Sequence, residues 1–467
     1  MATELTRHVF FIGLGGIGMS ALARHLLQQG HVVGGYDLTH SPLIGALIEE
    51  GMSVSHSQDP ETFPVWVHQG TPEDLTVVWT PAVPESSKVV QHFDARGIRR
   101  MKRAELLGSI TLGKATLAVA GTHGKTTTSS WLAAMLEATP EGCHAFLGGI
   151  DAKTGSNHFS RPKAHWHVVE ADEFDRSFHH LQPTHAGITN LDPDHLDVYG
   201  SMESFENAFH RFGQLVENTL ILPYDLPWKE NNHGQRIERF ACFQQGERIE
   251  QDLDHVAISS DATQEVEFHL QRKGARPLSF RAVPAMPGMH NLANALLASA
   301  LASHAEVDID IIQDKVQTFG GVRRRMEVHL NHAKGVYIDD YAHHPSELKA
   351  LIDTIRKQWP GRHVTMIFQP HLFSRTRDFG AQFAEVLSLV DRLFLLPIYP
   401  AREAPIPGVD AQWLFDNISS THKHLSTSES IFGSLKACPV DVLVTAGAGD
   451  IDRLVPKALQ HMQDRQN

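Results

Sequence analysis

Short apolar runs alternate with amphipathic stretches along most of the chain. Near the N-terminus, an apolar run at 8–12 is followed by a glycine-rich turn, a helical pattern over 19–29 and a second apolar run at 31–36. The pattern returns around a second glycine-rich turn, between the apolar run 116–120 and a helical pattern over 129–137. Apolar runs of this length, separated by helical periods, are typical of buried parallel strands joined by helices. The chain is therefore predicted to be an α/β protein.

The length of the chain and breaks in the alternation indicate three domains. A chain of 467 residues exceeds what one hydrophobic core usually supports. We predict a Rossmann-like domain over 1–107, a central P-loop ATPase-like domain over 108–318 and a second Rossmann-like domain over 319–467. The central domain should have a mostly parallel sheet with helices on both faces. Its residues 220–283 are predicted to be short strands and polar loops, and a single helix is expected from about 376 to 390.

Composition and charge fit an ordinary globular protein. Acidic side chains outnumber basic ones by 54 to 41, and the net charge of −13 argues against a nucleic-acid-binding surface. The three cysteines are far apart, so we expect no disulfide framework and a reducing cytoplasm. No apolar run reaches about eighteen residues, and the run 9–19 is interrupted by glycines. Neither a membrane span nor a signal peptide is therefore expected.

The second glycine-rich turn has the sequence Gly121-Thr-His-Gly-Lys-Thr126. Between a strand and a helix, such a turn can hold a phosphate with backbone N–H groups and the helix N-terminus. Lys125 would reach the phosphates, and the Thr126 hydroxyl could hold Mg²⁺. The common motif G-x-x-x-x-G-K-[ST] would place its first glycine at Val119, so this loop is a tighter variant. The alternative is an ordinary strand-to-helix turn.

Two further strand ends carry groups that could bind metal. Glu170 lies at the end of an apolar run in the sequence Glu-Ala-Asp-Glu, and we predict that it is the second ligand of the Mg²⁺. The alternative is a set of solvated acids. His195 follows the apolar run 186–189 and could ligate a second divalent cation, although a lone histidine there is more often a surface residue.

The N-terminal glycine-rich turn has the pattern G-x-G-x-x-G, formed by Gly13, Gly15 and Gly18, and Asp37 follows the next strand. Alone, this fingerprint suggests NAD. The same geometry binds any diphosphate at a helix N-terminus, with the acid on a ribose hydroxyl or merely capping the strand. The pattern therefore indicates a nucleotide diphosphate more firmly than it indicates NAD.

Polar clusters also occur in the last third of the chain. Asn291 and Asn294 either cap the helix that they begin or face an adenine edge. Arg325, in a run of three arginines, is either solvated or paired with a phosphate. Acids, a phenol and imidazoles share the turn 339–345, and 369–378 places a histidine and two arginines at a helix start. Arginine suits carboxylate recognition, whereas a solvated loop is the alternative for each cluster.

Six of these motifs occur in one order along the chain. They are Gly-Thr-His-Gly-Lys-Thr-Thr-Thr, Glu-Ala-Asp-Glu-Phe-Asp, Asp-Pro-Asp-His-Leu-Asp, His-Asn-Leu-Ala-Asn-Ala, Asp-Asp-Tyr-Ala-His-His-Pro and Gln-Pro-His-Leu-Phe-Ser-Arg-Thr-Arg-Asp. With the N-terminal glycine loop they resemble the ATP-dependent Mur ligases of peptidoglycan synthesis over nearly the whole chain. Within that family the motifs are most similar to the branch that joins L-alanine to UDP-N-acetylmuramate through an acyl phosphate.

The resemblance implies a role for each cluster. ATP would be bound by Gly121, Thr122, His123, Gly124, Lys125, Thr126 and Thr127, with Asn291 and Asn294 at the adenine and Asp340 at the ribose. The UDP-sugar would be bound by Gly13, Gly15, Gly16, Gly18, Asp37 and Thr80, and L-alanine by Tyr341, His343, His371 and Arg375. Catalysis would use Lys125, Glu170, His195 and Arg325, and the metal ligands would be Thr126, Glu170 and His195. Two Mg²⁺ ions are expected, with Mn²⁺ as a possible substitute, in a cytoplasmic bacterial enzyme that is a monomer or a homodimer and binds neither nucleic acid nor membrane.

The sequence departs from the family pattern at two places, and three other functions remain as alternatives. Many members have arginine where this chain has Leu372, and siblings carry a carbamylated lysine in a segment that here, over 202–217, contains no lysine. The near alternative is the related recycling ligase, which joins a preformed tripeptide to the same UDP-sugar. An NAD-dependent oxidoreductase would leave the phosphate loop unused, and a non-catalytic nucleotide-binding protein would not need metal-type residues at three strand ends.

Overall fold

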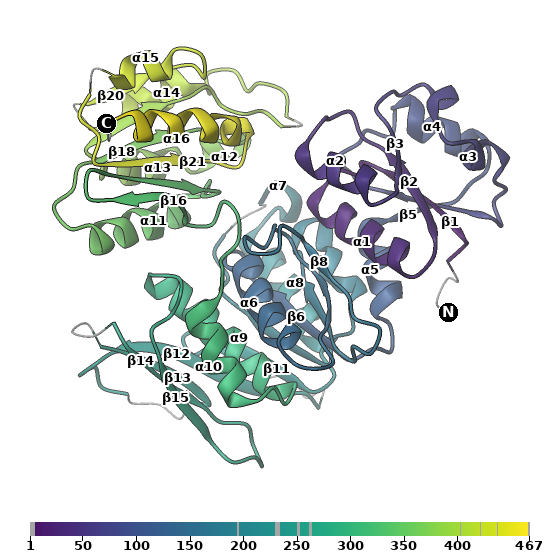
Figure 1. Cartoon of the computed structure of the whole chain (residues 1–467), viewed down its shortest axis with the longest axis horizontal. Helices are drawn as coiled ribbons and strands as arrows, with labels where there is room; N and C mark the ends of the chain where they lie inside the picture. The colour runs from purple at the N-terminus through teal and green to yellow at the C-terminus, as the bar shows by residue number, and fades with distance from the viewer. Residues whose placement is uncertain are drawn as a thin grey trace. The chain divides into compact units, whose positions relative to one another are not determined.

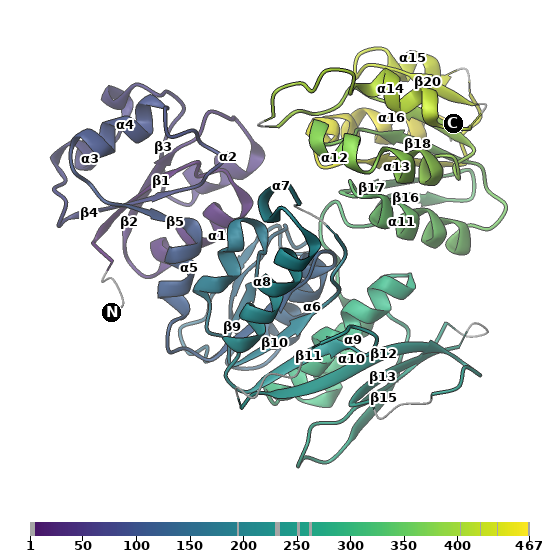
Figure 2. The ribbon, with the colours of Figure 1, turned by 180° about the vertical axis from the view of Figure 1, so that it is seen from behind.

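The computed structural model describes residues 5–193, 196–228, 234–249, 253–260, 264–401, 403–420, 422–436 and 438–465. It consists of two compact units. The first unit comprises residues 1–285 with 291–320, and the second comprises 286–290 with 321–467. Figures 1 and 2 show the chain from opposite sides. Three separate sheets run through these units, two in the first and one in the second.

The N-terminal sheet has five parallel strands in the order β3-β2-β1-β4-β5. Its strands are β1 (His8–Ile12), β2 (Val32–Tyr36), β3 (Ser53–Ser55), β4 (Leu75–Trp79) and β5 (Arg100–Lys102). The helices are α1 (Ile17–Gln28), α2 (Pro42–Glu49), η1 (Pro60–Thr62), α3 (Val65–Gln69), α4 (Lys88–Ala95) and α5 (Arg103–Thr111). Parallel strands in this order, connected by helices, form a Rossmann-like fold, as predicted.

The central sheet has ten strands in the order β15-β14-β13-β12-β11-β10-β6-β9-β7-β8. All neighbours from β13 to β7 are parallel, whereas β8, β14 and β15 pair antiparallel. The strands are β6 (Thr116–Ala120), β7 (His144–Phe146), β8 (His158–Phe159), β9 (His167–Glu170), β10 (His185–Ile188), β11 (Thr219–Pro223), β12 (Arg236–Gln244), β13 (His255–Ser259), β14 (Val266–Leu270) and β15 (Leu278–Ala282). The region 220–283 thus extends this sheet.

Helices lie on both faces of the central sheet, as predicted. In Figures 1 and 2, α9 and α10 cover one face and α8 the other. The helices are α6 (Lys125–Glu137), η2 (Phe174–His180), α7 (Leu196–Tyr199), α8 (Met202–Gln214), α9 (Met289–His304) and α10 (Ile309–Thr318). The prediction that α6 begins at Ser129 was wrong by four residues. The helix begins at Lys125, because Gly124 adopts a left-handed conformation (φ 82°) that ends the loop there.

One hydrophobic core joins the N-terminal and central sheets. Val9 and Phe11 of β1 belong to the same buried cluster as Ala118 of β6, Val169 of β9 and Phe205 of α8. The two domains therefore form a single compact unit although their sheets are separate. No helix among the described residues is long and apolar enough to cross a membrane.

The second unit contains a six-stranded sheet in the order β16-β17-β21-β18-β19-β20, parallel except for β16. Its strands are β16 (Glu327–His332), β17 (Gly335–Asp340), β18 (Val364–Phe368), β19 (Arg392–Leu395), β20 (Lys423–Leu425) and β21 (Val442–Ala446). The helices are α11 (Pro345–Gln358), α12 (Phe373–Asp378), α13 (Gly380–Leu387), α14 (Ala411–Asn417), α15 (Ile431–Lys436), η3 (Asp450–Leu454) and α16 (Val455–Asp464). This is the third α/β domain that the sequence predicts.

The single helix expected from 376 to 390 is wrong. Two helices, α12 and α13, meet at Phe379, whose backbone angles (φ −113°, ψ 18°) are not helical. Gly380 follows, and the indole of Trp413 lies where its Cβ would be. The close packing of Trp413 on this glycine, invisible in the local pattern, accompanies the break in the helix.

Candidate active site

The phosphate loop predicted at 121–126 has the strand, turn and helix that the motif requires. Gly121 (φ 123°) and Gly124 (φ 82°) have left-handed backbones, and neither has room for a side chain. A Cβ at Gly121 would overlap the Thr189 hydroxyl, and one at Gly124 would overlap the Asn294 amide oxygen. The loop is thus a tight backbone concavity at the N-terminus of α6, which is the arrangement that binds phosphate.

The end of β10 supports this loop from the side. The Asn190 amide oxygen accepts the His123 backbone N–H (3.0 Å), and the Asn190 amide donates to the His123 carbonyl (3.0 Å). Thr122 donates its hydroxyl to the backbone carbonyl of Asp192 (2.8 Å). These bonds fix the loop residues Thr122 and His123 in place. Sequence reasoning missed Asn190, although it directly follows an apolar strand in a polar segment.

Lys125 is buried beside the carboxylates that follow β9. Its Nζ lies 2.8 Å from a Glu173 carboxylate oxygen and donates to the backbone carbonyls of Gly121 (2.6 Å) and Thr122 (3.1 Å). Burial lowers the pKa of Lys125, but the neighbouring carboxylates, Glu173 foremost, raise it above its ordinary value. Burial raises the pKa of Glu173 to about 7, against the attraction of the ammonium. Glu173 was not among the predicted site residues.

Thr126 and Glu170 meet as the metal prediction requires. The Thr126 hydroxyl donates to both carboxylate oxygens of Glu170, at 3.1 and 3.0 Å, and the Gly148 N–H donates to one of them at 3.0 Å. A hydroxyl and a carboxylate form the oxygen donor set that Mg²⁺ prefers. These two residues therefore fit a magnesium ion. His195, the other predicted metal ligand, lies outside the described residues.

Asn291 and Asn294, at the start of α9, are both buried. Asn294 Oδ1 accepts the Thr128 hydroxyl of α6 (3.2 Å), and its amide lies 3.4 Å from Asn291 Oδ1. The N-terminal part of α9 is thereby joined to the phosphate-loop helix. Contact of the asparagines with adenine stays a prediction. Thr127, also predicted to bind ATP, is buried in the first turn of α6.

The N-terminal glycine loop brings its predicted residues together. Asp37 Oδ2 accepts the Gly15 N–H (2.8 Å), and Thr80 lies against Gly13, whose φ is 87°. Gly16 precedes α1 as its N-cap. A Cβ at Gly18 would lie 2.9 Å from the guanidinium of Arg103. The glycine loop, Asp37, Thr80 and Arg103 therefore meet at the N-terminus of α1, where the partial positive charge of the helix favours an anion such as a diphosphate.

Arg103 links the two glycine-rich loop regions of the first unit. Besides approaching Gly18, it forms an ion pair with Asp172, whose Oδ2 lies 2.9 Å from Arg103 Nη2. Asp172 follows β9, two residues after Glu170. The N-terminal glycine loop and the metal-type acids are thus joined through one side chain, which sequence reasoning did not single out.

In the second unit, the predicted amino-acid-binding residues gather at the ends of β17 and β18. His343 lies between Tyr341 and His371, with ring centroids 5.3 and 5.8 Å away, and burial lowers its pKa to about 3. Arg375 is buried, and its Nη1 is 3.5 Å from His371 Nδ1. Leu372 lies between them with a positive φ of 69°. The four residues form one cluster, which is what the prediction requires.

Asp340 and Arg325 also belong to the second unit. Asp340 accepts the backbone N–H groups of Met326 (2.6 Å) and Ala342 (2.7 Å), and burial raises its pKa to about 6. The Arg325 guanidinium lies 5.1 Å from the Tyr341 ring centroid, and its Nη1 is 3.7 Å from Glu347. Their predicted contacts with ATP and with the transferred phosphate stay predictions.

Comparison with known proteins covers the chain from end to end. Residues 8–115 match the model described as Mur ligase family, catalytic domain, 119–302 the Mur ligase middle domain, and 324–449 the Mur ligase, glutamate ligase domain. A UDP-N-acetylmuramate–L-alanine ligase of Porphyromonas gingivalis is 41% identical over 98% of this chain and 99% of its own length. A ligase of the same name from Cytophaga hutchinsonii is 42% identical over 96% and 95%.

Solved structures agree on the fold. The crystal structure of a UDP-N-acetylmuramate-alanine ligase from Thermotoga maritima aligns with 98% of this chain and 99% of its own, with a TM-score of 0.78 and 23% identity. A murein peptide ligase from Psychrobacter arcticus aligns with 97% and 98%, with a TM-score of 0.72 and 22% identity. At these identities the likeness concerns the three-domain α/β fold.

Proposed function

The chain belongs to the Mur ligase family, and we infer from this that it is an ATP-dependent ligase that forms an amide between the lactyl carboxylate of UDP-N-acetylmuramate and the amine of L-alanine. The observation that carries this inference is the 41% identity, over nearly the full length of both chains, to ligases of that name. The reaction serves the synthesis of peptidoglycan precursors. The family resemblance predicted from the six motifs is confirmed.

The chemistry proceeds in two steps. A carboxylate oxygen of the lactyl group attacks the γ-phosphorus of ATP, so that a C–O–P bond forms and ADP leaves. The amine of L-alanine then attacks the acyl carbon, the tetrahedral intermediate loses a proton from nitrogen, and phosphate departs. Several anionic groups have to approach each other in the first step, so the protein must supply positive charge and N–H donors.

The residues of the first unit supply those groups. Lys125 would move from Glu173 to the γ-phosphate, while N–H groups at the N-terminus of α6 would hold the other phosphates. The glycine loop of β1, with Asp37 and Thr80, would hold the UDP-sugar. The ion pair between Arg103 and Asp172 connects the β1 glycine loop to the acids beside the phosphate loop. This connection supports the proposal that the UDP-sugar and ATP take part in the same reaction.

Magnesium, the usual metal of the family, would be held by Thr126 and Glu170 and would neutralise phosphate charge. We propose His195 as a ligand of a second ion, with Mn²⁺ as a substitute.

In the second unit, Tyr341, His343, His371 and Arg375 would orient L-alanine, and Arg325 would approach the transferred phosphate. Because the proposed residues belong to two units, substrate-dependent closure is the expected gating step. A cytoplasmic monomer or homodimer without affinity for nucleic acid or membrane stays our expectation.

The deciding assay is phosphate release from ATP in the presence of Mg²⁺ and UDP-N-acetylmuramate. Release should require L-alanine and should produce one UDP-N-acetylmuramoyl-L-alanine per phosphate. If the tripeptide supports release and L-alanine does not, the protein is the recycling ligase. Oxidation of NADH without turnover of ATP would overturn the ligase assignment altogether.

A further inference from the structure

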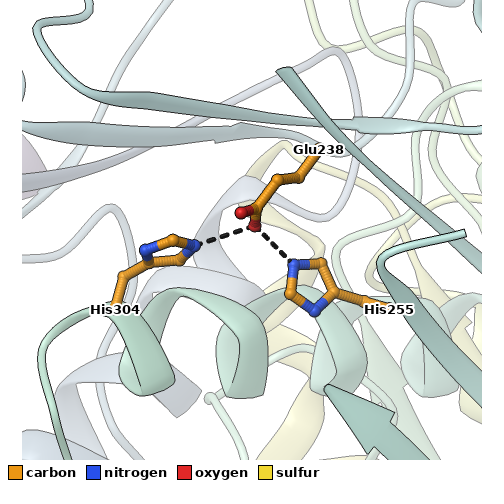
Figure 3. A group of neighbouring side chains, drawn as sticks. All are labelled: Glu238, His255 and His304. Carbon is orange, nitrogen blue, oxygen red and sulfur yellow. Dashed lines mark hydrogen bonds and ion pairs between the residues drawn. The ribbon is translucent and has the colours of Figure 1, made fainter. Parts of the chain in front are cut away.

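The extension of the central sheet contains a buried group of two imidazoles and one carboxylate that the ligase mechanism does not use. Glu238 lies on β12, His255 on the neighbouring strand β13, and His304 at the C-terminal end of α9 (Figure 3). The side chains of Glu238 and His255 are fully buried, and that of His304 is 8% exposed. We refer to these three residues as the His-Glu-His cluster.

The cluster is remote from the phosphate loop along α9. Asn294, which contacts the phosphate-loop helix, precedes His304 by ten residues. At a rise of 1.5 Å per residue, the two positions are about 15 Å apart along the helix axis. The cluster is therefore a separate feature of the first unit and not an outer part of the nucleotide site.

The ligand-type atoms of the three side chains converge on one point. His255 Nε2 and His304 Nε2 each lie 2.8 Å from the same oxygen, Oε2 of Glu238, as the dashed lines in Figure 3 show. All three candidate donor atoms lie within 4.8 Å of one another. Donors bonded to one tetrahedral Zn²⁺ at about 2.1 Å are about 3.4 Å apart, so the two oxygen–nitrogen separations need to open by only about 0.6 Å each.

The donor types select the ion. Two imidazole nitrogens and one carboxylate oxygen are a recurrent protein ligand set for Zn²⁺, with a water molecule in the fourth position. Mg²⁺ and Ca²⁺ prefer oxygen ligands throughout, so the nitrogen donors of His255 and His304 argue against them. No other imidazole-containing group among the described residues brings so deeply buried a set of metal-type atoms together; the group Glu327, His329 and Asp339 is only partly buried.

Neighbouring charges hold the carboxylate in a one-oxygen binding mode. Arg236 Nη2 lies 3.0 Å from Oε1 of Glu238, the oxygen that neither imidazole contacts, and 3.8 Å from a carboxylate oxygen of Asp254. Oε2 is thus directed at the imidazoles while Oε1 has an outer partner, and partners of this kind orient metal-binding carboxylates. His255 Nδ1 has no hydrogen-bond partner among the described residues, so this imidazole lacks such support. We expect an affinity of about micromolar, weaker than in sites where every ligand is so oriented.

We propose that Glu238, His255 and His304 bind a divalent transition-metal ion, for which Zn²⁺ is the best match. The ion would join two adjacent strands to the C-terminal end of α9, the helix whose N-terminal part contacts the phosphate-loop helix through Asn294. Its role is structural, because two of its three ligands are fully buried and none lies near the nucleotide residues. The competing account is a metal-free hydrogen-bonded triad, in which both imidazoles simply donate to the carboxylate.

The test is a Zn²⁺ titration of the full-length protein after removal of metals with a chelator. Excess Mg²⁺ is kept present so that oxygen-ligand sites are filled. The informative variants are His304→Gln and His255→Gln, because a glutamine amide can still donate to Glu238 but is a poor zinc ligand. The matched control is His269→Gln on β14, the next strand of the same sheet, whose imidazole lies outside the cluster.

Wild type and His269→Gln should bind one equivalent of Zn²⁺ and unfold at a higher temperature with it. They should also give the visible absorption of tetrahedral Co²⁺ when cobalt is added instead. Both cluster variants should lose this equivalent, with an affinity reduced at least about 100-fold, while keeping the far-UV circular dichroism of the wild type. The proposal would be overturned in favour of the metal-free triad by identical isotherms in all four proteins. It would also be overturned if wild type bound no zinc at about 100 μM. If His255→Gln does not fold, His304→Gln at the helix end decides.

Discussion

Acid should destabilise the first unit through histidines packed between α1 and the edge of the central sheet. His25 of α1 lies with its Nδ1 3.4 Å from Nε2 of His158 on β8, and His144 and His167, on β7 and β9, have ring centroids 4.7 Å apart. His25, His158 and His167 are each less than 10% exposed. Burial, reinforced by neighbouring imidazoles, lowers the pKa of His25 and His158 to about 3 and that of His167 to about 4.

The sign and the size of the effect follow from linkage. A histidine whose folded pKa lies below its unfolded value of about 6.5 takes up protons more readily when the chain is unfolded, so acid favours unfolding. The stability that these neutral histidines contribute is fully present above about pH 6.5. It is lost as the pH falls from there toward 3–4. At pH 5 each of the three groups costs about 2 kcal/mol, together about 6 kcal/mol. A loss of this size is comparable with the whole stability of many domains, about 5–15 kcal/mol.

The measurement is urea unfolding followed by tryptophan fluorescence at about pH 7.5 and about pH 5.0. In His158→Phe, which keeps an aromatic ring against Phe146, the loss of unfolding free energy between the two pH values should shrink by about 2 kcal/mol. The matched control, His68→Phe at an exposed position of α3, should lose as much as wild type. If His158→Phe is as acid-sensitive as wild type, the buried imidazoles are not the origin of the effect.

Three further substitutions test the phosphate and metal residues. Lys125→Ala should reduce phosphate release at least about 100-fold while calorimetry shows unchanged UDP-sugar affinity; equal loss of both would contradict the separate sites proposed here. Gly148→Ala places a methyl group against the Glu170 carboxylate and should raise the Mg²⁺ concentration needed for half-maximal turnover by about tenfold, whereas Gly45→Ala, in open space, should not. Glu173→Gln removes the negative charge beside the buried ammonium of Lys125 and should lower the unfolding free energy by about 3 kcal/mol, so an unchanged urea midpoint would refute the importance of this ion pair.

The sequence predicts the features that depend on short stretches of chain. Short apolar runs, of about five residues each, identify the strands. The clustered glycines that follow two of these runs identify both glycine-rich loops. The meeting of Thr126 with Glu170 could also be predicted, because Glu170 ends one buried strand, Thr126 follows another, and the two strands prove to be parallel. β6 and β9 are direct neighbours, and their carboxyl ends therefore lie at the same edge.

Contacts that depend on strand order and packing could not be predicted. Arg103 reaches Asp172 across 69 residues, and Asn190 bonds to the phosphate loop across 67. Arg103 and Asn190 belong to no recognisable motif. The hydrophobic pattern around each of them does not indicate which distant residue it contacts. The His-Glu-His cluster has the same origin, because Glu238 and His304 are 66 residues apart and meet only when α9 packs on the sheet. The break in the helix at Phe379 is likewise accompanied by packing of the distant Trp413 on Gly380.

The carboxylates after β9 explain why Glu170, and not one of its neighbours, is suited to an added metal ion. Glu173 is paired with Lys125, and Asp172 with Arg103. Among the described residues, Glu170 accepts hydrogen bonds only from uncharged groups, the Thr126 hydroxyl and the Gly148 N–H. In this arrangement the two side-chain cations pair with Glu173 and Asp172, and neither pairs with Glu170. A triphosphate can approach this edge of the sheet only if further positive charge comes with it. The pairing of these side chains therefore supports the proposed place of a divalent cation at Glu170.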